Sequence, residues 1–252
     1  MIVADNDSSD ATHDVAASFA GILPALTIVE SGERVGHAVA ANGGIEAASG
    51  EKILFLDADD EVAPGYLAAM ADALEHHRLV GARLDSVTLN APWSLGSRPP
   101  SQEDGLGSPY GFLSAAAGCS LGVRRSLVER IGGFDPELPV CDDIDFCWRA
   151  QLAGDELVFV PDAVVLYRYR DTLRSIFRQG RGYGRAGPLL YRKYREKGMP
   201  RRSWRSVCRY WLGAAARLLC AWSKAERAEA AFLLGQRVGV IEGCWRSRVW
   251  YL

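Results

Sequence analysis

Acidic side chains gather in two places along this chain. At residues 53–60 the sequence is Ile-Leu-Phe-Leu-Asp-Ala-Asp-Asp, so Asp57 and Asp59 stand one residue apart at the end of an expected strand. Both carboxylates can then converge on one point, and hard oxygen ligands suit Mg²⁺ or Mn²⁺ held together with substrate phosphates. Asp is also common in turns and at helix starts. Three acids in four residues behind an apolar run nevertheless favour a metal-diphosphate site.

The second cluster comprises Asp142, Asp143 and Asp145, at the start of an expected helix. Acids in a first helical turn complement the helix dipole, and a single acid there would need no further explanation. Three acids at close quarters repel one another, which can raise a pKa and produce a usable base. This cluster is therefore a candidate source of a general base.

The elements that must position these acids alternate between strand and helix. Strands are expected at 2–4, 26–29, 53–56, 80–89, 119–123 and 157–160, and helices at 11–20, 35–48, 64–76, 126–131 and 142–153. Residues 90–110 are rich in Pro, Gly and Ser and are expected to form a mobile loop. The alternation predicts an α/β fold with a Rossmann-like, mainly parallel sheet and helices on both faces. Ligands of such sheets bind beyond the carboxyl ends of the strands, where Asp5 and Asp57 both lie.

Charge divides the 252-residue chain into two regions. Residues 1–167 carry 9 Lys/Arg and 26 Asp/Glu, a formal charge of −17, whereas residues 168–252 carry 20 Lys/Arg and 5 Asp/Glu, a formal charge of +15. We expect a catalytic domain over 1–167 and a basic, helical C-terminal region over 168–252 that meets anions. Nucleic acid is not an expected partner, because the acidic body would repel phosphates.

The composition predicts a globular protein with a hydrophobic core, located in the cytoplasm. Hydrophobic residues make up 48% of the chain, and its six cysteines include no Cys-x-x-Cys pair. No signal peptide opens the chain. The longest charge-free run, residues 105–123, contains five glycines and is poor material for a membrane-spanning helix.

Six segments together resemble the family 2 glycosyltransferases of the GT-A fold. They lie at residues 2–10, 41–51, 57–59 (Asp-Ala-Asp), 132–135 (Gly-Gly-Phe-Asp), 142–145 (Asp-Asp-Ile-Asp) and 160–165 (Val-Pro-Asp-Ala-Val-Val). They stand in the family's order over about 165 residues, which is more specific than any single short motif.

The resemblance implies a role for each matching position. On the donor side, Asp5 contacts the base or ribose of a nucleotide, Asn42 belongs to the same nucleotide-binding set, Asp57 faces the ribose or the metal, and Asp59 ligates the metal. On the acceptor side, Asp143 is the catalytic base, and Asp142 replaces the Glu that usually precedes it.

Three departures from the family pattern accompany this resemblance. The chain starts at what looks like the family's second strand, which implies either a misassigned start or a shortened member. Ala41 stands where many relatives have an Arg before Asn42. Tyr167 lies near the place where many relatives have a metal-binding His.

The basic region contains a stripe of apolar residues at helical spacing. Its members are Trp204, Val207, Cys208, Trp211, Leu212, Ala215, Leu218, Leu219 and Trp222. Flanked by Arg202, Arg205 and Arg209, this stripe suits a helix lying in an anionic membrane surface. It suits equally a helix packed on the catalytic domain or on a dimer partner. Upstream, residues 178–185 faintly resemble the Gln-x-x-Arg-Trp element of processive relatives, but the spacing does not match.

The resemblance implies an inverting, metal-dependent glycosyltransferase that uses Mg²⁺ or Mn²⁺. It would move a sugar from a nucleoside-diphosphate sugar to the hydroxyl of a saccharide or lipid-linked acceptor. The protein is expected in the cytoplasm, peripheral to the inner face of the cell membrane. Two alternatives stay open: a sugar nucleotidyltransferase, whose usual Gly-rich basic loop is missing here, and a degenerate transferase that only binds partners.

Overall fold

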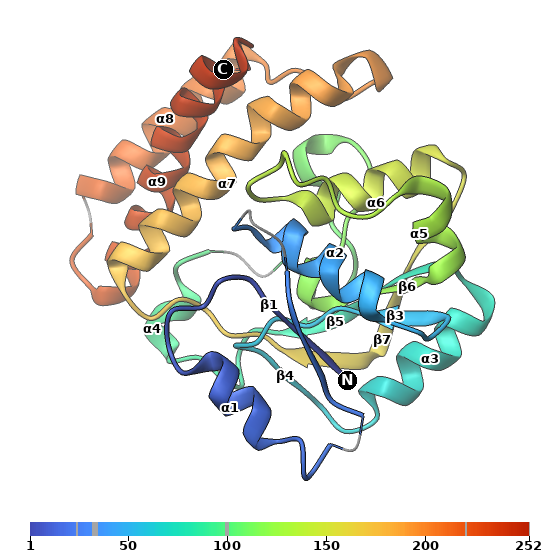
Figure 1. Ribbon diagram of the computed structural model, residues 1–252. Helices are drawn as coiled ribbons and strands as arrows, with labels where there is room; N and C mark the ends of the chain where they lie inside the picture. The colour runs from blue at the N-terminus through green and yellow to red at the C-terminus, as the bar shows by residue number, and fades with distance from the viewer. Residues whose placement is uncertain (24, 32–34, 99–100, 220, 252) are drawn as a thin grey trace.

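The strands form two separate sheets in the computed structural model, which describes residues 1–23, 25–31, 35–98, 101–219 and 221–251. In the smaller sheet β1 (Ile2–Asp5) pairs with β2 (Thr27–Glu30). The larger sheet has the order β3-β6-β5-β7-β4 (Figure 1). Its strands are β3 (Lys52–Leu54), β4 (Glu61–Val62), β5 (Leu79–Asp85), β6 (Leu121–Arg124) and β7 (Leu157–Leu166).

The larger sheet is mixed, so the prediction of a mainly parallel sheet was wrong. Among the described residues, β5–β7 is the only parallel pair in it, while β3–β6, β6–β5 and β7–β4 are antiparallel pairs. Parallel neighbours need a crossover that returns the chain to the same end of the sheet. The segment between β5 and β6 makes no such crossover, so β6 enters in the opposite direction.

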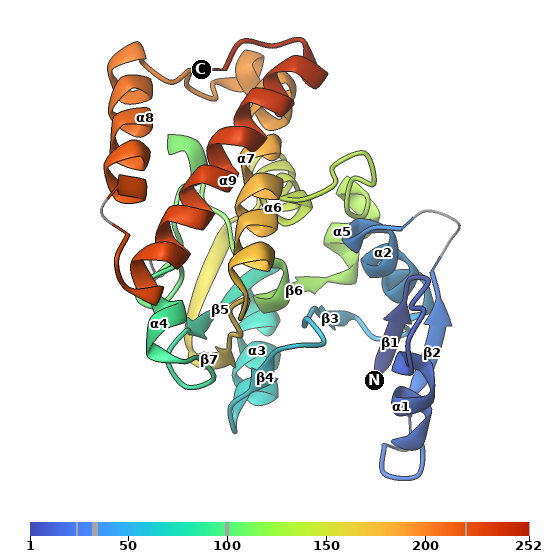
Figure 2. The ribbon, with the colours of Figure 1, turned by 90° about the vertical axis from the view of Figure 1, so that its left-hand side faces the viewer.

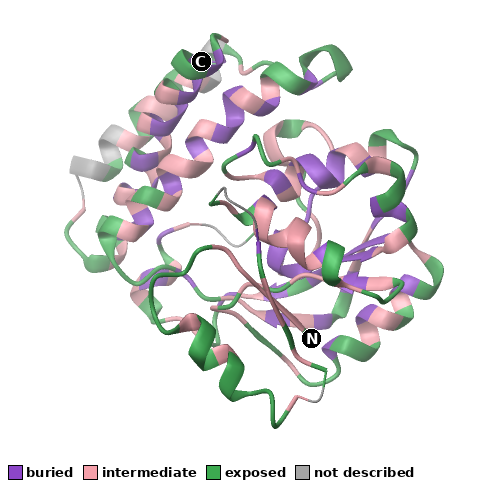
Figure 3. Cartoon of the chain, viewed as in Figure 1, coloured by how far each residue is buried: buried purple, intermediate pink, exposed green. Residues whose placement is uncertain are grey.

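Helices cover both faces of the larger sheet, as predicted. On one face α2 (His37–Ala47), α5 (Arg125–Ile131) and α6 (Asp142–Leu152) share a core with Leu79 and Leu121. On the other face α3 (Tyr66–His76) packs on Val80. Leu79 and Val80 are neighbours in β5, and they serve opposite cores because side chains alternate along a strand. Figure 3 shows the buried residues concentrated in this layer, whereas α1 (Thr12–Ser18) is largely exposed.

Every strand and helix predicted before residue 160 is present, with ends shifted by a few residues. The two-residue strand β4 was not predicted, and β7 continues to Leu166 beyond the expected end at residue 160. A register shift between Ala82 and Arg83 accompanies this longer pairing. The segment 90–110, expected as a loop, includes a short helix α4 (Pro92–Leu95) and the start of a 3₁₀ turn, η1 (Pro109–Gly111).

The C-terminal region is helical, as predicted. It consists of α7 (Leu173–Tyr194), the 3₁₀ turn η3 (Arg195–Lys197), α8 (Trp204–Leu219) and α9 (Lys224–Ser247). The helices α7 and α9 run side by side, as both ribbon views show (Figures 1 and 2). Among the described residues, no helix combines the length and apolar character needed to cross a bilayer.

Glycines let α7 and α9 approach backbone to backbone. A Cβ at Gly180 or Gly184 would lie 2.3 or 2.2 Å from a carbonyl oxygen of α9, and one at Gly239 would lie 2.1 Å from a carbonyl oxygen of α7. Two ion pairs close the same interface, because Glu242 of α9 accepts hydrogen bonds from Arg181 and Arg185 of α7. Gly180 and Gly184 therefore serve the packing of the two helices, whereas Gly182 faces Val140 and lines a cavity.

The C-terminal helices also dock on α6. Trp148 of α6 is fully buried and contacts Tyr194 of α7, with ring centroids 5.1 Å apart. Asp145, the third acid of the second cluster, is buried among α7 groups and accepts a hydrogen bond from the Tyr194 hydroxyl at 2.6 Å. Its carboxylate also pairs with Lys193 at 2.6 Å and Arg149 at 2.8 Å. Asp145 thus fastens the two regions together, and the boundary at residues 167 and 168 stays a prediction.

Candidate active site

The start of α6 brings the second acidic cluster to a large cavity. Cys141, just before the helix, has φ 61°, a left-handed conformation that few non-glycine residues adopt. This turn directs the first residues of α6, Asp142 and Asp143, toward the cavity, which both of them line. Strained backbone of this kind is common at functional sites.

His37 at the start of α2 links the two acidic clusters. Its Nδ1 lies 2.7 Å from Oδ2 of Asp142, and its Nε2 lies 3.8 Å from Oδ1 of Asp57. The hydrogen bond to buried Asp142 raises the pKa of His37 to about 9. His37 is therefore an imidazolium at neutral pH, and it holds together two carboxylates that lie far apart in the sequence.

Asp143 has the properties of a general base. Its Oδ2 accepts a hydrogen bond from the backbone N–H of Gly118 at 2.9 Å, and its Oδ1 accepts one from Ile144 at 2.8 Å. Burial, together with the neighbouring Asp142 charge, raises the pKa of Asp143 to about 6. A carboxylate with a pKa near the working pH combines the ionised form with a useful proton affinity.

Hard oxygen donors suited to a divalent metal meet at the first cluster. Ligand atoms of Asp57, Asp60 and Cys119 lie within 4.8 Å of one another. Burial raises the pKa of Asp57, and it raises that of Asp60 to about 6. Among the residues that the structure describes, the buried Oδ2 of Asp60 finds no hydrogen-bond partner, which suits a site that a cation completes. Burial also raises the pKa of Cys119 far above its usual range, so its sulfur stays protonated and the two carboxylates fit Mg²⁺ or Mn²⁺ better.

Asp59, predicted as a metal ligand, points to a different partner. Its Oδ2 pairs with the guanidinium of Arg170 at 2.7 Å, and Arg170 lines the cavity. The structure therefore brings Asp57, Asp142 and Asp143 to the cavity wall, whereas Asp59 touches that wall through Arg170. Ligation of a metal by Asp59 stays a prediction, and one of its two carboxylate oxygens is engaged by Arg170.

The other two predicted donor contacts, Asp5 and Asn42, are not among the residues that line the cavity. Asp5 ends β1, and its carboxylate accepts a hydrogen bond from the hydroxyl of Ser8 in the following turn. Asn42 donates to the carbonyl of Phe134 at 2.9 Å and accepts from its N–H at 2.8 Å. A Cβ at Gly133 would lie 2.2 Å from the Asn42 oxygen, so the Gly-Gly-Phe-Asp segment needs glycine there. Both nucleotide contacts stay predictions.

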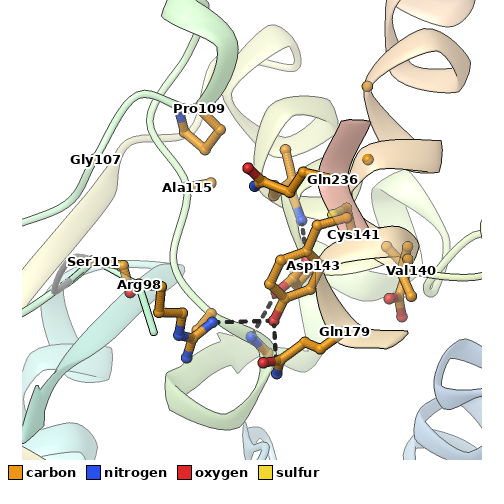
Figure 4. A pocket seen from close by; sticks show the side chains of 18 of the residues that line it. Arg98, Ser101, Gly107, Pro109, Ala115, Val140, Cys141, Asp143, Gln179 and Gln236 are labelled. Carbon is orange, nitrogen blue, oxygen red and sulfur yellow. Dashed lines mark hydrogen bonds between the residues drawn. The ribbon is translucent and has the colours of Figure 1, made fainter. Parts of the chain in front are cut away.

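The cavity has a volume of about 1090 Å³ and is lined by residues of both the sheet region and the C-terminal helices. Besides the acids it is lined by polar and aromatic residues that were not predicted as site residues from the sequence. These include His37, Arg98, Tyr110, Tyr167, Gln179, Tyr183, Arg202, Tyr210, Gln236 and Tyr251. Figure 4 shows Arg98, Asp143, Gln179 and Gln236 around it. No spacing in the sequence marks these residues, since they come from segments far apart in the chain.

The family profile described as "Glycosyl transferase family 2" matches residues 1–132, more than half of the chain. Among curated proteins, "Pre-mycofactocin glycosyltransferase" of Mycobacterium tuberculosis is 27% identical over 210 residues, covering 76% of this chain and 42% of that protein. "Glycosyltransferase AglE" of Haloferax volcanii is 27% identical over 187 residues, covering 72% of this chain and 62% of that protein. The chain thus spans less than two thirds of the length of these relatives.

Solved structures support the fold. The mannosyltransferase PcManGT of Pyrobaculum calidifontis, crystallised with GDP-Man and Mn²⁺, matches with a TM-score of 0.63 at 21% identity, covering 97% of this chain and 77% of that chain. GalNAc-T7 with UDP, GalNAc and Mn²⁺ matches with a TM-score of 0.52 at 17% identity, covering 68% of this chain and 37% of that chain. With the profile match and the order of its motifs, the chain belongs to glycosyl transferase family 2.

Proposed function

We propose that this protein is an inverting, metal-dependent glycosyltransferase. It would move a sugar from a nucleoside-diphosphate sugar to an acceptor hydroxyl. The observation that carries the proposal is the meeting of Asp57, His37, Asp142 and Asp143 at one cavity, with hard oxygen donors and a raised-pKa carboxylate side by side. Similar proteins crystallised with GDP-Man or UDP and with Mn²⁺ agree with it.

Asp143 would act as the base. An acceptor hydroxyl is a weak nucleophile until a carboxylate takes its proton, and Asp143 faces the cavity with a pKa of about 6. The two backbone N–H groups bonded to it fix its orientation. Attack from the face opposite the leaving diphosphate would invert the anomeric centre.

His37 and Asp142 would keep this geometry in place. Asp142 is only 4% exposed, and a buried carboxylate needs a partner to remain ionised. The imidazolium of His37 supplies that partner at 2.7 Å and also stands close to Asp57 on the metal side. His37 is therefore a positioning residue between the donor and acceptor sides of the site.

The metal site would use Asp57 and Asp60. Asp59 would become a further ligand when its ion pair with Arg170 opens. A divalent cation bound there would neutralise the oxygens of the departing diphosphate. The protein's own part is to hold these carboxylates close together and partly buried, so that their charges repel until a cation arrives.

Nucleotide binding and transfer test the proposal separately. UDP, GDP and dTDP are titrated calorimetrically with and without Mn²⁺, and one of them should bind more tightly with the metal. Asp143→Asn should then leave nucleotide binding nearly intact and lower transfer by roughly 10²- to 10⁴-fold. Asp162→Asn, an exposed carboxylate on β7, is the matched control. The proposal is wrong if no nucleotide binds in either condition.

We also propose that the C-terminal helices rest on an anionic membrane surface. Of the predicted stripe, the side chains of Trp204, Ala215, Leu218 and Leu219 lie outside the described residues. Leu212 and Trp222 are 70% and 82% exposed, and Trp245 and Trp250, outside the predicted stripe, are 83% and 68% exposed. Exposed Trp beside exposed Arg246 and Arg248 suits the interface of such a surface.

A further inference from the structure

Besides its carboxylates, the cavity is lined by basic side chains. Three arginines line it in addition to the Arg170 already paired with Asp59: Arg98, Arg178 and Arg202. Within the described part of the chain, none of these three forms an ion pair with a carboxylate. The acids among its lining residues are Asp57, Asp142 and Asp143, the carboxylates of the candidate active site.

Arg98 is held by tyrosines instead of by an acid. Its guanidinium lies 4.8 Å from the ring centroid of Tyr167 and 4.6 Å from that of Tyr169. Its Nη1 donates a hydrogen bond to the Tyr183 hydroxyl at 3.3 Å, and Gln179 reaches the same hydroxyl at 3.5 Å. Arg98 and Gln179 accordingly converge in Figure 4. The half-buried cation is thus fixed in place with donor groups left over.

Arg202 repeats this arrangement on the C-terminal side. Its guanidinium lies 4.6 Å from the ring centroid of Tyr210 and 5.4 Å from that of Tyr251. Tyr251 is 1% exposed, and it in turn contacts Tyr110 of the cavity wall, so the ring that supports Arg202 is itself fixed. Arg178 adds an exposed third guanidinium from α7.

A cation taken partly out of water is costly unless an anion or hydrogen-bond acceptors replace the water. Aromatic rings offset part of that cost and orient the guanidinium, but they use few of its five N–H donors. A planar guanidinium fixed in this way is suited to bind carboxylate or phosphate oxygens in pairs. Two such guanidinia line the same cavity as Asp143.

We propose that the acceptor carries an oxyanion, a phosphate or a carboxylate, which Arg98 and Arg202 bind while the acceptor hydroxyl lies at Asp143. The proposal rests on the proposed function and names its acceptor class. The tyrosines between the arginines would contact the apolar or sugar part of the acceptor. Neutral acceptors would lack the interaction that compensates the two cations, so they would bind more weakly.

Small probes that share one ring test the proposal on the full chain. Phenyl phosphate, benzoate and neutral benzyl alcohol are titrated with the protein, followed by ligand-observed NMR. The nucleoside diphosphate that binds best and Mn²⁺ are present at saturation, so that the donor side is filled. The variants are Arg98→Gln and Arg202→Gln, with exposed Arg83→Gln of β5 as the control. Circular dichroism and nucleotide affinity establish that each variant is folded.

At least one anionic probe should bind wild type and Arg83→Gln, and benzyl alcohol should bind more weakly. Loss of a charge-assisted contact should lower probe affinity about tenfold or more in Arg98→Gln and Arg202→Gln, with nucleotide affinity unchanged. Phenyl phosphate and benzoate tell which oxyanion is preferred. Equal affinity in wild type and both variants, equal binding of the neutral probe, or no probe binding while nucleotide binds would each overturn the acceptor proposal. Failure of the nucleotide to bind would instead overturn the proposed function.

Discussion

The contact between α7 and α9 predicts a large effect from one methyl group. Gly239 of α9 is buried, and a Cβ there would lie 2.1 Å from the carbonyl oxygen of Arg181, 2.9 Å from its carbonyl carbon and 3.0 Å from the backbone nitrogen of Arg185. All three atoms belong to the α7 backbone and cannot rotate away. In Gly239→Ala the two helices must therefore move apart.

Two opposing contributions set the change in the free energy of unfolding in Gly239→Ala. Replacing Gly by Ala in a helix stabilises it by about 1 kcal/mol. Overpacking costs typically about 1–3 kcal/mol, and an obstacle made of backbone places this site near the upper end. The net expectation is a destabilisation of about 2 kcal/mol. For a chain of this size each kcal/mol lowers Tm by about 2–4 °C, so the melting temperature should fall by about 4–8 °C.

The assay compares Gly239→Ala with Gly213→Ala in α8, where nothing lies within 4 Å of the added Cβ. Thermal melts followed by circular dichroism, with urea midpoints as a second measure, should show the first variant destabilised and the control equal to wild type or more stable. Because α7 and α9 carry Gln179 and Gln236 into the cavity, transfer should fall more than nucleotide binding. A Gly239→Ala protein that melts at or above the wild-type temperature would refute the close backbone contact.

The remaining predictions concern the site and the surface. Transfer should rise as the pH passes about 6, where Asp143 becomes ionised, and level off above it; a rate that is flat from pH 5 to 8 would exclude this carboxylate as the base. The raised pKa of His37 stabilises the fold below pH 6.5, and this contribution is lost as the pH rises through about 9, so His37→Gln should lower stability by about 1–2 kcal/mol at pH 6 and by less at pH 10. Chelation of divalent ions should weaken nucleotide binding in the wild type but change little in Asp57→Asn; equal losses would point to a metal site elsewhere. Anionic vesicles should sediment the wild type less well as salt increases, and Trp245→Ser with Trp250→Ser should weaken this further; indifference to such vesicles at low salt would end the membrane proposal.

The order of strands and helices along the chain could be predicted from the sequence, whereas the pairing and direction of the strands could not. Apolar runs and their spacing located the main strands and helices before residue 160, though not β4 or α4, because those signals lie within ten or so residues. Strand direction depends instead on which distant segments pair. The antiparallel entry of β6 and the pairing of β4 with the end of β7 are such long-range choices. A two-residue strand like β4 also carries no periodicity to detect.

The site residues also divide into those that local sequence predicts and those that depend on long-range contacts. Asp57, Asp142 and Asp143 could be singled out because acids clustered in sequence stay clustered in space. His37 could not, since a lone histidine at a helix start has no partner nearby in the sequence, and its link to Asp142 spans 105 positions. Arg98 could not be predicted either, because the tyrosines that fix its guanidinium come from segments much later in the sequence.

The charge asymmetry of the sequence acquires two physical roles in the structure. Some basic residues of the C-terminal region bind acids of the body: Lys193 pairs with Asp135 and Asp145, and Arg170 pairs with Asp59. These ion pairs act together with apolar packing such as that of Trp148 on Tyr194. They join a C-terminal region with a formal charge of +15 to a body with a formal charge of −17. The carboxylates that line the cavity attract a cation, whereas the arginines that line it can attract an anion. A cavity that holds charges of both signs can orient a substrate that is itself charged at one end, because reversing the substrate would set like charges against each other.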